Sequence, residues 1–222
     1  NQFEIIAAAY DKYGNNCLNL FNGIWALFIY DIKKNKIFLS RDRLGVKPLF
    51  FYKSSDLFIF CSELKAILKH PLVEKKIDED WCVEYLQKGL FFLNNNKDFD
   101  YSPYSNIREF KENSYYESEV NSILNSGIRT NTFYEFKVNR SNEKFDQKKF
   151  SMYSEQFRNL LDDAVKIRIP KDENVLVGNA LGGIDSSILA YLTAKNTADK
   201  DRHLTFSSVY KSSETNYCDE SY

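Results

Sequence analysis

The stretch Asn174-Val-Leu-Val-Gly-Asn-Ala-Leu-Gly-Gly-Ile-Asp-Ser-Ser-Ile-Leu-Ala-Tyr-Leu192 has the pattern of a strand, a glycine turn and the start of a helix. The apolar run 175–177 predicts a strand that is covered on both faces. Gly182-Gly183 has no side chains to hinder a close approach, and Asp185-Ser-Ser187 offers caps for helical N–H groups. Because exposed N–H groups at a helix N-terminus bind anions, we expect a phosphate or pyrophosphate here. A strand–turn–helix without a ligand is the alternative.

The turn Gly182-Gly-Ile-Asp-Ser-Ser187 fits neither the Gly-x-Gly-x-x-Gly pattern nor the Walker pattern of nucleotide-binding loops. It resembles the Ser-Gly-Gly-x-Asp-Ser loop of ATP pyrophosphatases, which activate a carboxylate by adenylation. The first serine of that loop is absent, because Leu181 stands directly before Gly182. The simplest alignment is the loss of one serine.

The composition is that of a folded, cytoplasmic-type protein of one large or two small domains, with 222 residues and a net charge of −1. That charge gives no electrostatic case for nucleic acid, and no apolar run reaches the roughly 18 residues of a membrane span. The chain starts at Asn1 and not at Met, which suggests a fragment or a processed product. We expect scattered, reduced and mostly buried thiols and no zinc site from Cys17, Cys61, Cys82 and Cys218.

The first third of the chain predicts a helix followed by an antiparallel meander. The helix covers residues 4–13 and ends at Gly14. Apolar runs then predict four strands, buried on both sides, over residues 24–30, 37–40, 49–52 and 57–61. A short helix follows at 63–69. Four charged residues stand out in this otherwise apolar region: Arg41, Asp42, Arg43 and Glu63. We favour an internal ion-pair network that joins the loop to the short helix over a catalytic role for them.

The rest of the chain changes from turns and short strands to a helix–strand alternation. Asp78 or Asp80 is expected to cap a helix that ends at Gly89, and residues 94–106 are polar and turn-rich. Expected elements are strands at 114–117 and 132–138, a linker at 140–149, a helix at 150–168, a helix at 186–195 and a strand at 205–210. Such an order predicts a parallel sheet with right-handed crossovers and a ligand at the carboxyl ends of its strands.

Four blocks in the first part resemble the glutaminase domain of glutamine-hydrolysing asparagine synthetases, in matching order and spacing. They are Glu4-Ile-Ile-Ala-Ala-Ala-Tyr-Asp-Lys-Tyr-Gly14, Phe21-Asn-Gly-Ile-Trp-Ala26, Ser40-Arg-Asp-Arg-Leu-Gly-Val-Lys-Pro-Leu49 and Cys61-Ser-Glu-Leu-Lys-Ala-Ile-Leu68. The resemblance implies an α/β protein of two domains. Residues 1–149 would be the C-terminal part of an Ntn-type antiparallel α+β glutaminase domain of class II. Residues 150–222 would begin a parallel α/β ATP-pyrophosphatase domain.

The resemblance also implies substrates, cofactors and roles. ATP and Mg²⁺ would convert aspartate to an acyl-adenylate, which ammonia from glutamine attacks, and the protein would be cytoplasmic and a possible homodimer. The nucleophilic cysteine is expected before residue 1. Gln2 takes the place of an aspartate that holds the glutamine amino group, and a neutral amide is a poorer partner. The positions matching the ATP and pyrophosphate site are Leu181, Gly182, Gly183, Asp185, Ser186 and Ser208, with Asp185 also as the magnesium contact.

Two other readings stay open at this point. A related enzyme with an inactive glutaminase, such as a β-lactam synthetase or a lasso-peptide cyclase, would adenylate a different carboxylate and need no ammonia. A non-catalytic scaffold or pseudoenzyme would carry an altered loop that no longer holds ATP.

Overall fold

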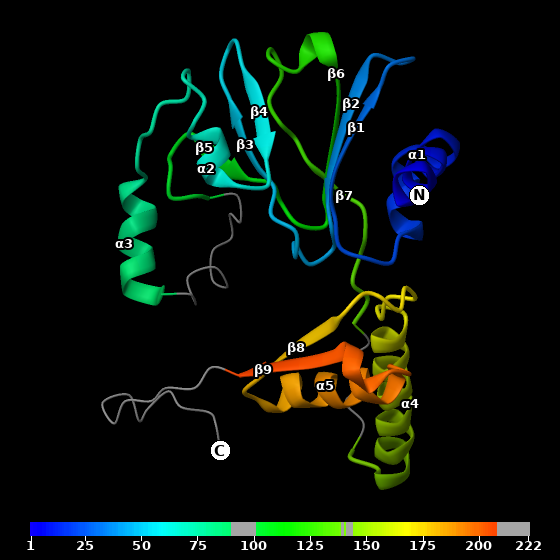
Figure 1. Ribbon diagram of the computed structural model, residues 1–222. Helices are drawn as coiled ribbons and strands as arrows, with labels where there is room; N and C mark the ends of the chain where they lie inside the picture. The colour runs from blue at the N-terminus through cyan, green and yellow to red at the C-terminus, as the bar shows by residue number, and fades with distance from the viewer. Residues whose placement is uncertain (90–100, 139, 141–143, 208–222) are drawn as a thin grey trace. The chain divides into compact units, whose positions relative to one another are not determined.

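The chain folds into two compact units, Asn1–Asn139 and Arg140–Tyr222, which Figure 1 traces by colour. The computed structural model describes residues 1–89, 101–138, 140 and 144–207 of the chain. The division lies before helix α4 (Gln147–Lys166), whereas the sequence-based boundary at 149/150 falls inside that helix.

The first unit consists of short helices and seven antiparallel strands among its described residues. In chain order they are α1 (Gln2–Tyr13), the 3-10 helix η1 (Gly14–Leu20), β1 (Ala26–Asp31), β2 (Lys36–Arg41), β3 (Phe50–Lys53), β4 (Phe58–Cys61), α2 (Leu64–Ile67), α3 (Glu79–Lys88), β5 (Ile107–Glu109), β6 (Ser114–Glu119), the 3-10 helix η3 (Val120–Ser122) and β7 (Asn131–Thr132).

The helix ends follow local chemistry. The Asn1 side chain accepts the N–H of Phe3 at 3.1 Å and so begins α1. Asp78 does the same for α3, accepting the N–H of Trp81 at 2.9 Å, so Asp78 and not Asp80 is the cap. Gly14 and Gly89 follow the two helices with φ of 58° and 59°, a region that favours glycine. The predicted C-terminal ends of both helices are confirmed, whereas α1 begins at Gln2 and not at Glu4.

The predicted four-stranded meander is wrong, because its strands divide between two sheets. One sheet has the order β1-β2-β6-β7 and the other the order β4-β3-β5. The two hairpins exist as expected, but β2 pairs with β6 and not with β3. The expected burial on both sides is also wrong for β1, where Phe28 and Tyr30 are 43% and 47% exposed. The predicted strand at 132–138 shrinks to the two residues of β7.

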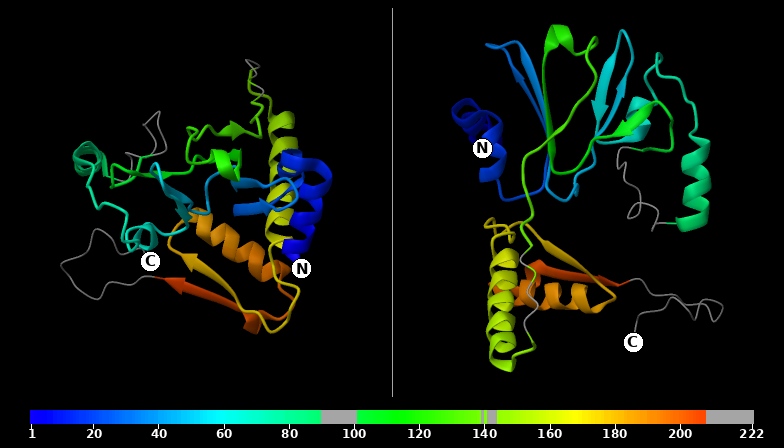
Figure 2. Two further views of the ribbon diagram at one scale, coloured as in Figure 1. Left: turned by 90° about the horizontal axis from the view of Figure 1, so that it is seen from above. Right: turned by 180° about the vertical axis from the view of Figure 1, so that it is seen from behind.

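Three apolar clusters show that the first unit has four layers. Tyr10 of α1 packs on Phe38 of β2, with ring centroids 5.0 Å apart. A second cluster joins the sheets through Leu39 of β2 and Phe110, with Phe51 of β3 packed against them. A third places Ile67 of α2 against the other face of the β4-β3-β5 sheet. The layers are therefore helix, sheet, sheet and helix, as both views in Figure 2 agree.

The turn after β2 explains why the chain changes sheets. The Asp42 carboxylate is buried and accepts the N–H groups of Trp25, Leu44, Val46 and Lys47 at 3.0–3.2 Å. The N–H of Asp42 in turn donates to the carbonyl of Trp25 at 3.0 Å. These bonds satisfy donors that a sheet would otherwise pair and turn the chain out of the first sheet.

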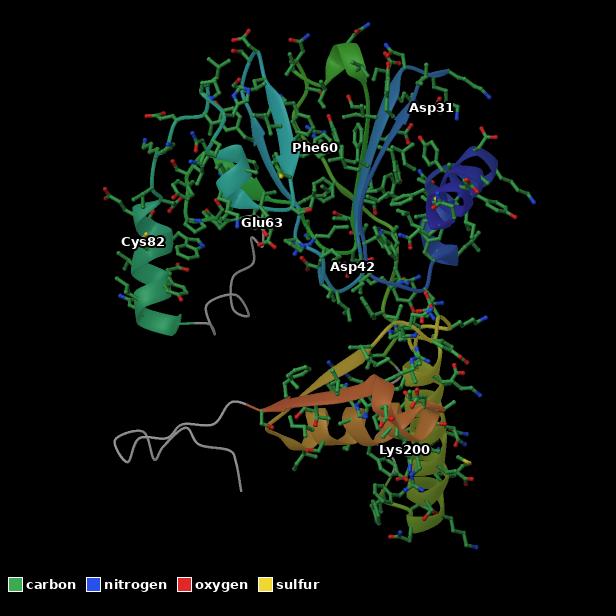
Figure 3. All side chains as sticks on the ribbon, in the orientation of Figure 1. Asp31, Asp42, Phe60, Glu63, Cys82 and Lys200 are labelled. Atoms are coloured by element: carbon green, nitrogen blue, oxygen red, sulfur yellow. The ribbon has the colours of Figure 1, made fainter. Side chains whose placement is uncertain are left out.

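Arg41 completes this turn, but not in the way the sequence predicts. Its guanidinium forms an ion pair with Glu109 of β5 at 2.7 Å, so it links the two sheets. It also donates to the carbonyls of Lys47, Gly45 and Phe110 at 2.7–2.8 Å. Glu63 pairs instead with the exposed Lys65, and Figure 3 shows Glu63 beside α2, away from Asp42. The expected network between the loop and the helix is therefore wrong.

The second unit has a two-stranded sheet and two helices among its described residues. After α4 come β8 (Val177–Leu181), α5 (Ile184–Asn196), the 3-10 helix η4 (Lys200–Arg202) and β9 (His203–Ser207). The strands β8 and β9 are parallel, as predicted, with Leu181 opposite Ser207. The strand expected at 175–177 begins only at Val177, and Leu176 is 60% exposed. None of the described helices is both long and apolar enough to cross a membrane.

Helices α4 and α5 are joined by a polar clamp. Asp162 of α4 accepts the Asn196 amide at 2.9 Å and the Lys195 ammonium at 3.1 Å. The hydrogen bond from Asn196, together with Lys195, holds the pKa of Asp162 below its ordinary value. The ionised form is therefore the one that fastens α5, which carries the glycine turn at its N-terminus.

We predict that Asp42→Asn lowers the free energy of unfolding of the first unit by about 2–4 kcal/mol. The new amide has one acceptor oxygen and directs its own N–H groups at backbone donors. Both tryptophans, Trp25 and Trp81, lie in this unit, so urea unfolding followed by tryptophan fluorescence measures the change. Asp56→Asn, at an exposed turn, is the matched control. Equal stability of the two variants would contradict the role given to Asp42.

We predict that the Asp162 clamp is pH-dependent. Its folded-state pKa is depressed, so its stabilisation is present above the unfolded value of about 3.9 and is lost as pH falls through the lower folded value. Asp162→Asn should therefore speed hydrogen exchange of the α5 amides at neutral pH. In strong acid the variant and the parent should exchange alike. The control is the exposed neighbour Asp163→Asn, and a similar effect of that change would count against the clamp.

Candidate functional site

The glycine turn lies at the carboxyl end of β8. Leu181 is the last residue of the strand, and α5 begins at Ile184, so Gly182 and Gly183 alone connect them. The backbone of Gly183 is extended, with φ of −147°. The strand, the two-residue turn and the helix thus bring five of the predicted residues into one short segment: Leu181, Gly182, Gly183, Asp185 and Ser186.

Gly183 is held by the side chains of the helix that follows it. Its N–H donates to Ser186 Oγ at 3.0 Å. Its carbonyl accepts the hydroxyls of Ser186 and Ser187 at 2.9 and 2.8 Å, and the N–H of Ser187 at 3.0 Å. The N-cap is therefore Gly183, and the residues predicted as caps lie within the first turn because the helix starts earlier than expected.

The N-terminal end of α5 has the features of an anion site. The bond from the Ser187 N–H to Gly183 is the first of the helix, so the N–H groups of residues 184–186 precede the helical ladder. Gly182, Gly183 and Asp185 are exposed to solvent. A Cβ built on Gly183 would meet nothing closer than Ser186 Oγ at 4.0 Å, so packing within the chain does not demand glycine there. Phosphate oxygens fit such a cradle.

The other two predicted positions are Ser208 and Gln2. Ser208 lies outside the described residues. Gln2 is the first residue of α1 in the other unit, with an exposed side chain. Within the described ranges, no three His, Cys, Asp or Glu side chains gather as a metal-binding group.

Some positioning residues have no signal in the sequence. Arg202 is 9% exposed and donates to the carbonyls of Pro170, Asp172 and Val175 at 2.6–3.3 Å, which fixes the chain before β8. His203 Nε2 lies 2.8 Å from Asn179 Oδ1 and links the two strands. The two residues of each hydrogen bond are 24 to 32 positions apart in the sequence, so no local pattern predicts these bonds.

Cys17 lies where its thiol is not activated. Cys17 is fully buried, and burial raises the pKa of its thiol, which disfavours the nucleophilic thiolate. Cys61 and Cys82 are partly buried and unpaired, in accord with the predicted reduced state, and of the three described cysteines Cys17 alone is fully buried. Cys218 lies outside the described residues.

Comparison with known proteins gives the family. The glutamine amidotransferase domain model matches residues 2–134, which is most of the first unit. A candidate glutamine-hydrolysing asparagine synthetase of Methanocaldococcus jannaschii is 38% identical over 208 residues, covering 92% of this chain and 37% of that protein. The glutamine-hydrolysing asparagine synthetases 3 and 2 of Bacillus subtilis are 28% and 29% identical and cover 86% and 96% of this chain.

The chain is much shorter than these relatives. It spans 37% of the Methanocaldococcus jannaschii protein and 28% and 27% of the two Bacillus subtilis proteins. The domain match covers more than half of the chain, and the glutamine-hydrolysing asparagine synthetases align with nearly all of it. This chain belongs to the glutamine amidotransferase domain family and is a relative of the glutamine-hydrolysing asparagine synthetases.

Proposed function

We propose that the protein carrying this chain is a ligase that makes asparagine from aspartate, with ATP as energy source and glutamine as ammonia donor. One observation carries the proposal. The amidotransferase match ends at residue 134, but an asparagine synthetase aligns over 96% of the chain, and so well into the second unit. The likeness therefore includes the segment with the glycine turn.

The proposed reaction has three balanced steps. Hydrolysis of the glutamine amide yields glutamate and ammonia. A carboxylate oxygen of aspartate attacks the α-phosphorus of ATP, and pyrophosphate leaves. Ammonia then attacks the activated carbonyl carbon, so that the amide forms and AMP departs. Adenylation is needed because a carboxylate oxygen is a poor leaving group, whereas AMP is a good one.

In this proposal the N-terminal end of α5 holds the pyrophosphate part of ATP. The N–H groups of residues 184–186 and the open space at Gly183 suit phosphate oxygens. The hydroxyl of Ser186, which is hydrogen-bonded to the Gly183 backbone, is the side-chain donor that belongs to this group of residues. The backbone of Leu181 would contact the nucleotide, and Ser208 would line the adenine pocket.

Asp185 would hold Mg²⁺, which would neutralise charge on the phosphates. The carboxylate is exposed in the first turn of α5. Magnesium is usually bound by one or two carboxylates together with substrate phosphates and water, so a single aspartate fits that pattern. At the proposed glutamine site Gln2 would stand near the amino group of the substrate.

Gln2 is also the observation that favours the alternative. An amide attracts an ammonium group less strongly than a carboxylate does, so glutamine would be held weakly. A related adenylating enzyme with an inactive glutaminase, of the β-lactam synthetase or lasso-peptide cyclase type, would tolerate this change.

We predict that Asp185→Ala, in the full polypeptide that carries this chain, abolishes aspartate-dependent exchange of pyrophosphate into ATP. Glutamine hydrolysis, where the parent shows it, should be unchanged, because the substitution lies in the other unit. Asp201→Ala, at an exposed position in η4, is the control and should retain full exchange.

The outcomes separate the three readings. Full exchange in Asp185→Ala would show that the assignment of the magnesium residue is wrong. Exchange in the parent with another carboxylate, but not with aspartate, would favour the alternative enzyme. A parent that binds no nucleotide would be a non-catalytic protein with an altered loop.

A further inference from the structure

The segment between η1 and β1 contains the one Asn-Gly pair of the sequence, Asn22-Gly23. Both residues are exposed, and both lie outside the helices and strands. Gly23 is not among the glycines with a positive φ, and a Cβ built on it would meet no atom within 4 Å. Neither the backbone conformation nor the packing of the described residues therefore demands glycine at this position.

Both ends of this segment are fixed by the turn after β2. The Phe21 carbonyl accepts a hydrogen bond from Arg43 Nη1 at 2.7 Å, and the Trp25 N–H donates to the Asp42 carboxylate at 3.2 Å. The rings of Phe21 and Trp25 also meet edge to face, with centroids 5.7 Å apart. The Asn-Gly pair between them makes no hydrogen bond with any other described residue. The Gly23 nitrogen is therefore open to reaction within this part of the chain.

An asparagine side chain in this setting can react with the backbone that follows it. The Gly23 nitrogen loses its proton and attacks Cγ of Asn22, so that a succinimide ring forms and Nδ2 leaves as ammonia. Water then opens either carbonyl of the ring, which gives aspartate or the β-linked isoaspartate. Glycine favours the attack because no side chain hinders the approach of its nitrogen. The net reaction consumes one water, releases one ammonia and needs no oxidant or cofactor.

We propose that Asn22 is a site of spontaneous deamidation, and that its isoaspartate form loosens the segment from the turn after β2. Isoaspartate adds one methylene group to the main chain between two ends that Arg43 and Asp42 hold. The bond from Trp25 to Asp42 is the longer of the two, so it is the one that yields. The aspartate form keeps the original length of the main chain and adds only a negative charge at an exposed position.

Asn125 provides a control within the same chain. It is exposed and is followed by the small residue Ser126. The Ser126 N–H, however, donates to the Ser122 carbonyl at 3.0 Å, which holds the nitrogen that would attack. Because the fold supplies this protection, the ratio of the deamidation rate of Asn22 to that of Asn125 should be larger in the native protein than in urea.

The first test is incubation of the full polypeptide that carries this chain in mildly alkaline buffer, followed by peptide mapping with mass spectrometry. We expect the peptide with Asn22 to split into aspartate and isoaspartate forms while Asn125 stays intact. Gly23→Ala should slow the reaction about tenfold or more, because a methyl group hinders the attacking nitrogen. Circular dichroism verifies that this variant folds.

Three results would overturn the proposed site. They are an Asn22 that stays intact in the native protein, a Gly23→Ala variant that reacts as fast as the parent, and equal rate ratios of Asn22 to Asn125 in native protein and in urea.

Hydrogen exchange tests the structural consequence. In the isoaspartate form, enriched by ion-exchange chromatography, the Trp25 N–H should exchange about tenfold faster than in the parent, because its acceptor is displaced. Asn22→Asp, measured when freshly purified, changes the charge but not the length of the main chain, so its Trp25 N–H should exchange as in the parent. An isoaspartate form that exchanges this proton no faster than Asn22→Asp does would contradict the loosening.

Discussion

The first unit depends on one buried carboxylate. Asp42 accepts four backbone N–H groups and donates its own N–H to Trp25, so it fastens the end of β2, the start of β1 and the loop between the sheets. An ionised acceptor suits converging donors better than a neutral one. Arg41 connects the same turn to the second sheet through its ion pair with Glu109. The four-layer core follows from this turn, since the chain could otherwise continue as a single meander.

The sequence predicts what local chemistry decides. The glycines at the ends of α1 and α3 and the Asp78 cap are visible in the residues themselves, as are the two hairpins. The pairing of β2 with β6 is invisible, because Phe38 meets Glu117 across a long stretch of chain and no local pattern records that choice. The partner of Arg41 cannot be read from the sequence for the same reason: charge patterning near the loop suggests Glu63, whereas the folded chain supplies Glu109.

In the second unit the sequence predicts the parallel sheet and the turn but misplaces the strand. The apolar run at 175–177 has strand propensity, yet Arg202 takes the Val175 carbonyl, and pairing with β9 starts at Val177. The turn is shorter than the loop that it resembles, since no serine separates Leu181 from Gly182. Ser186 reaches back to Gly183, so a hydroxyl already occupies one donor of the cradle. A nucleotide phosphate would compete with that hydroxyl for the Gly183 N–H.

The proposed chemistry predicts where each oxygen of the activated aspartate carboxylate goes. If aspartate is adenylated, one of its carboxylate oxygens becomes the bridge to the phosphorus and leaves with AMP when ammonia attacks. The most direct measurement therefore uses aspartate whose side-chain carboxylate alone carries heavy oxygen. After turnover of the full polypeptide with ATP and glutamine, mass spectrometry of AMP and of asparagine follows the label. We expect AMP that carries one labelled oxygen and asparagine that retains the other. Turnover that yields ADP with labelled phosphate, or AMP without label, would contradict it.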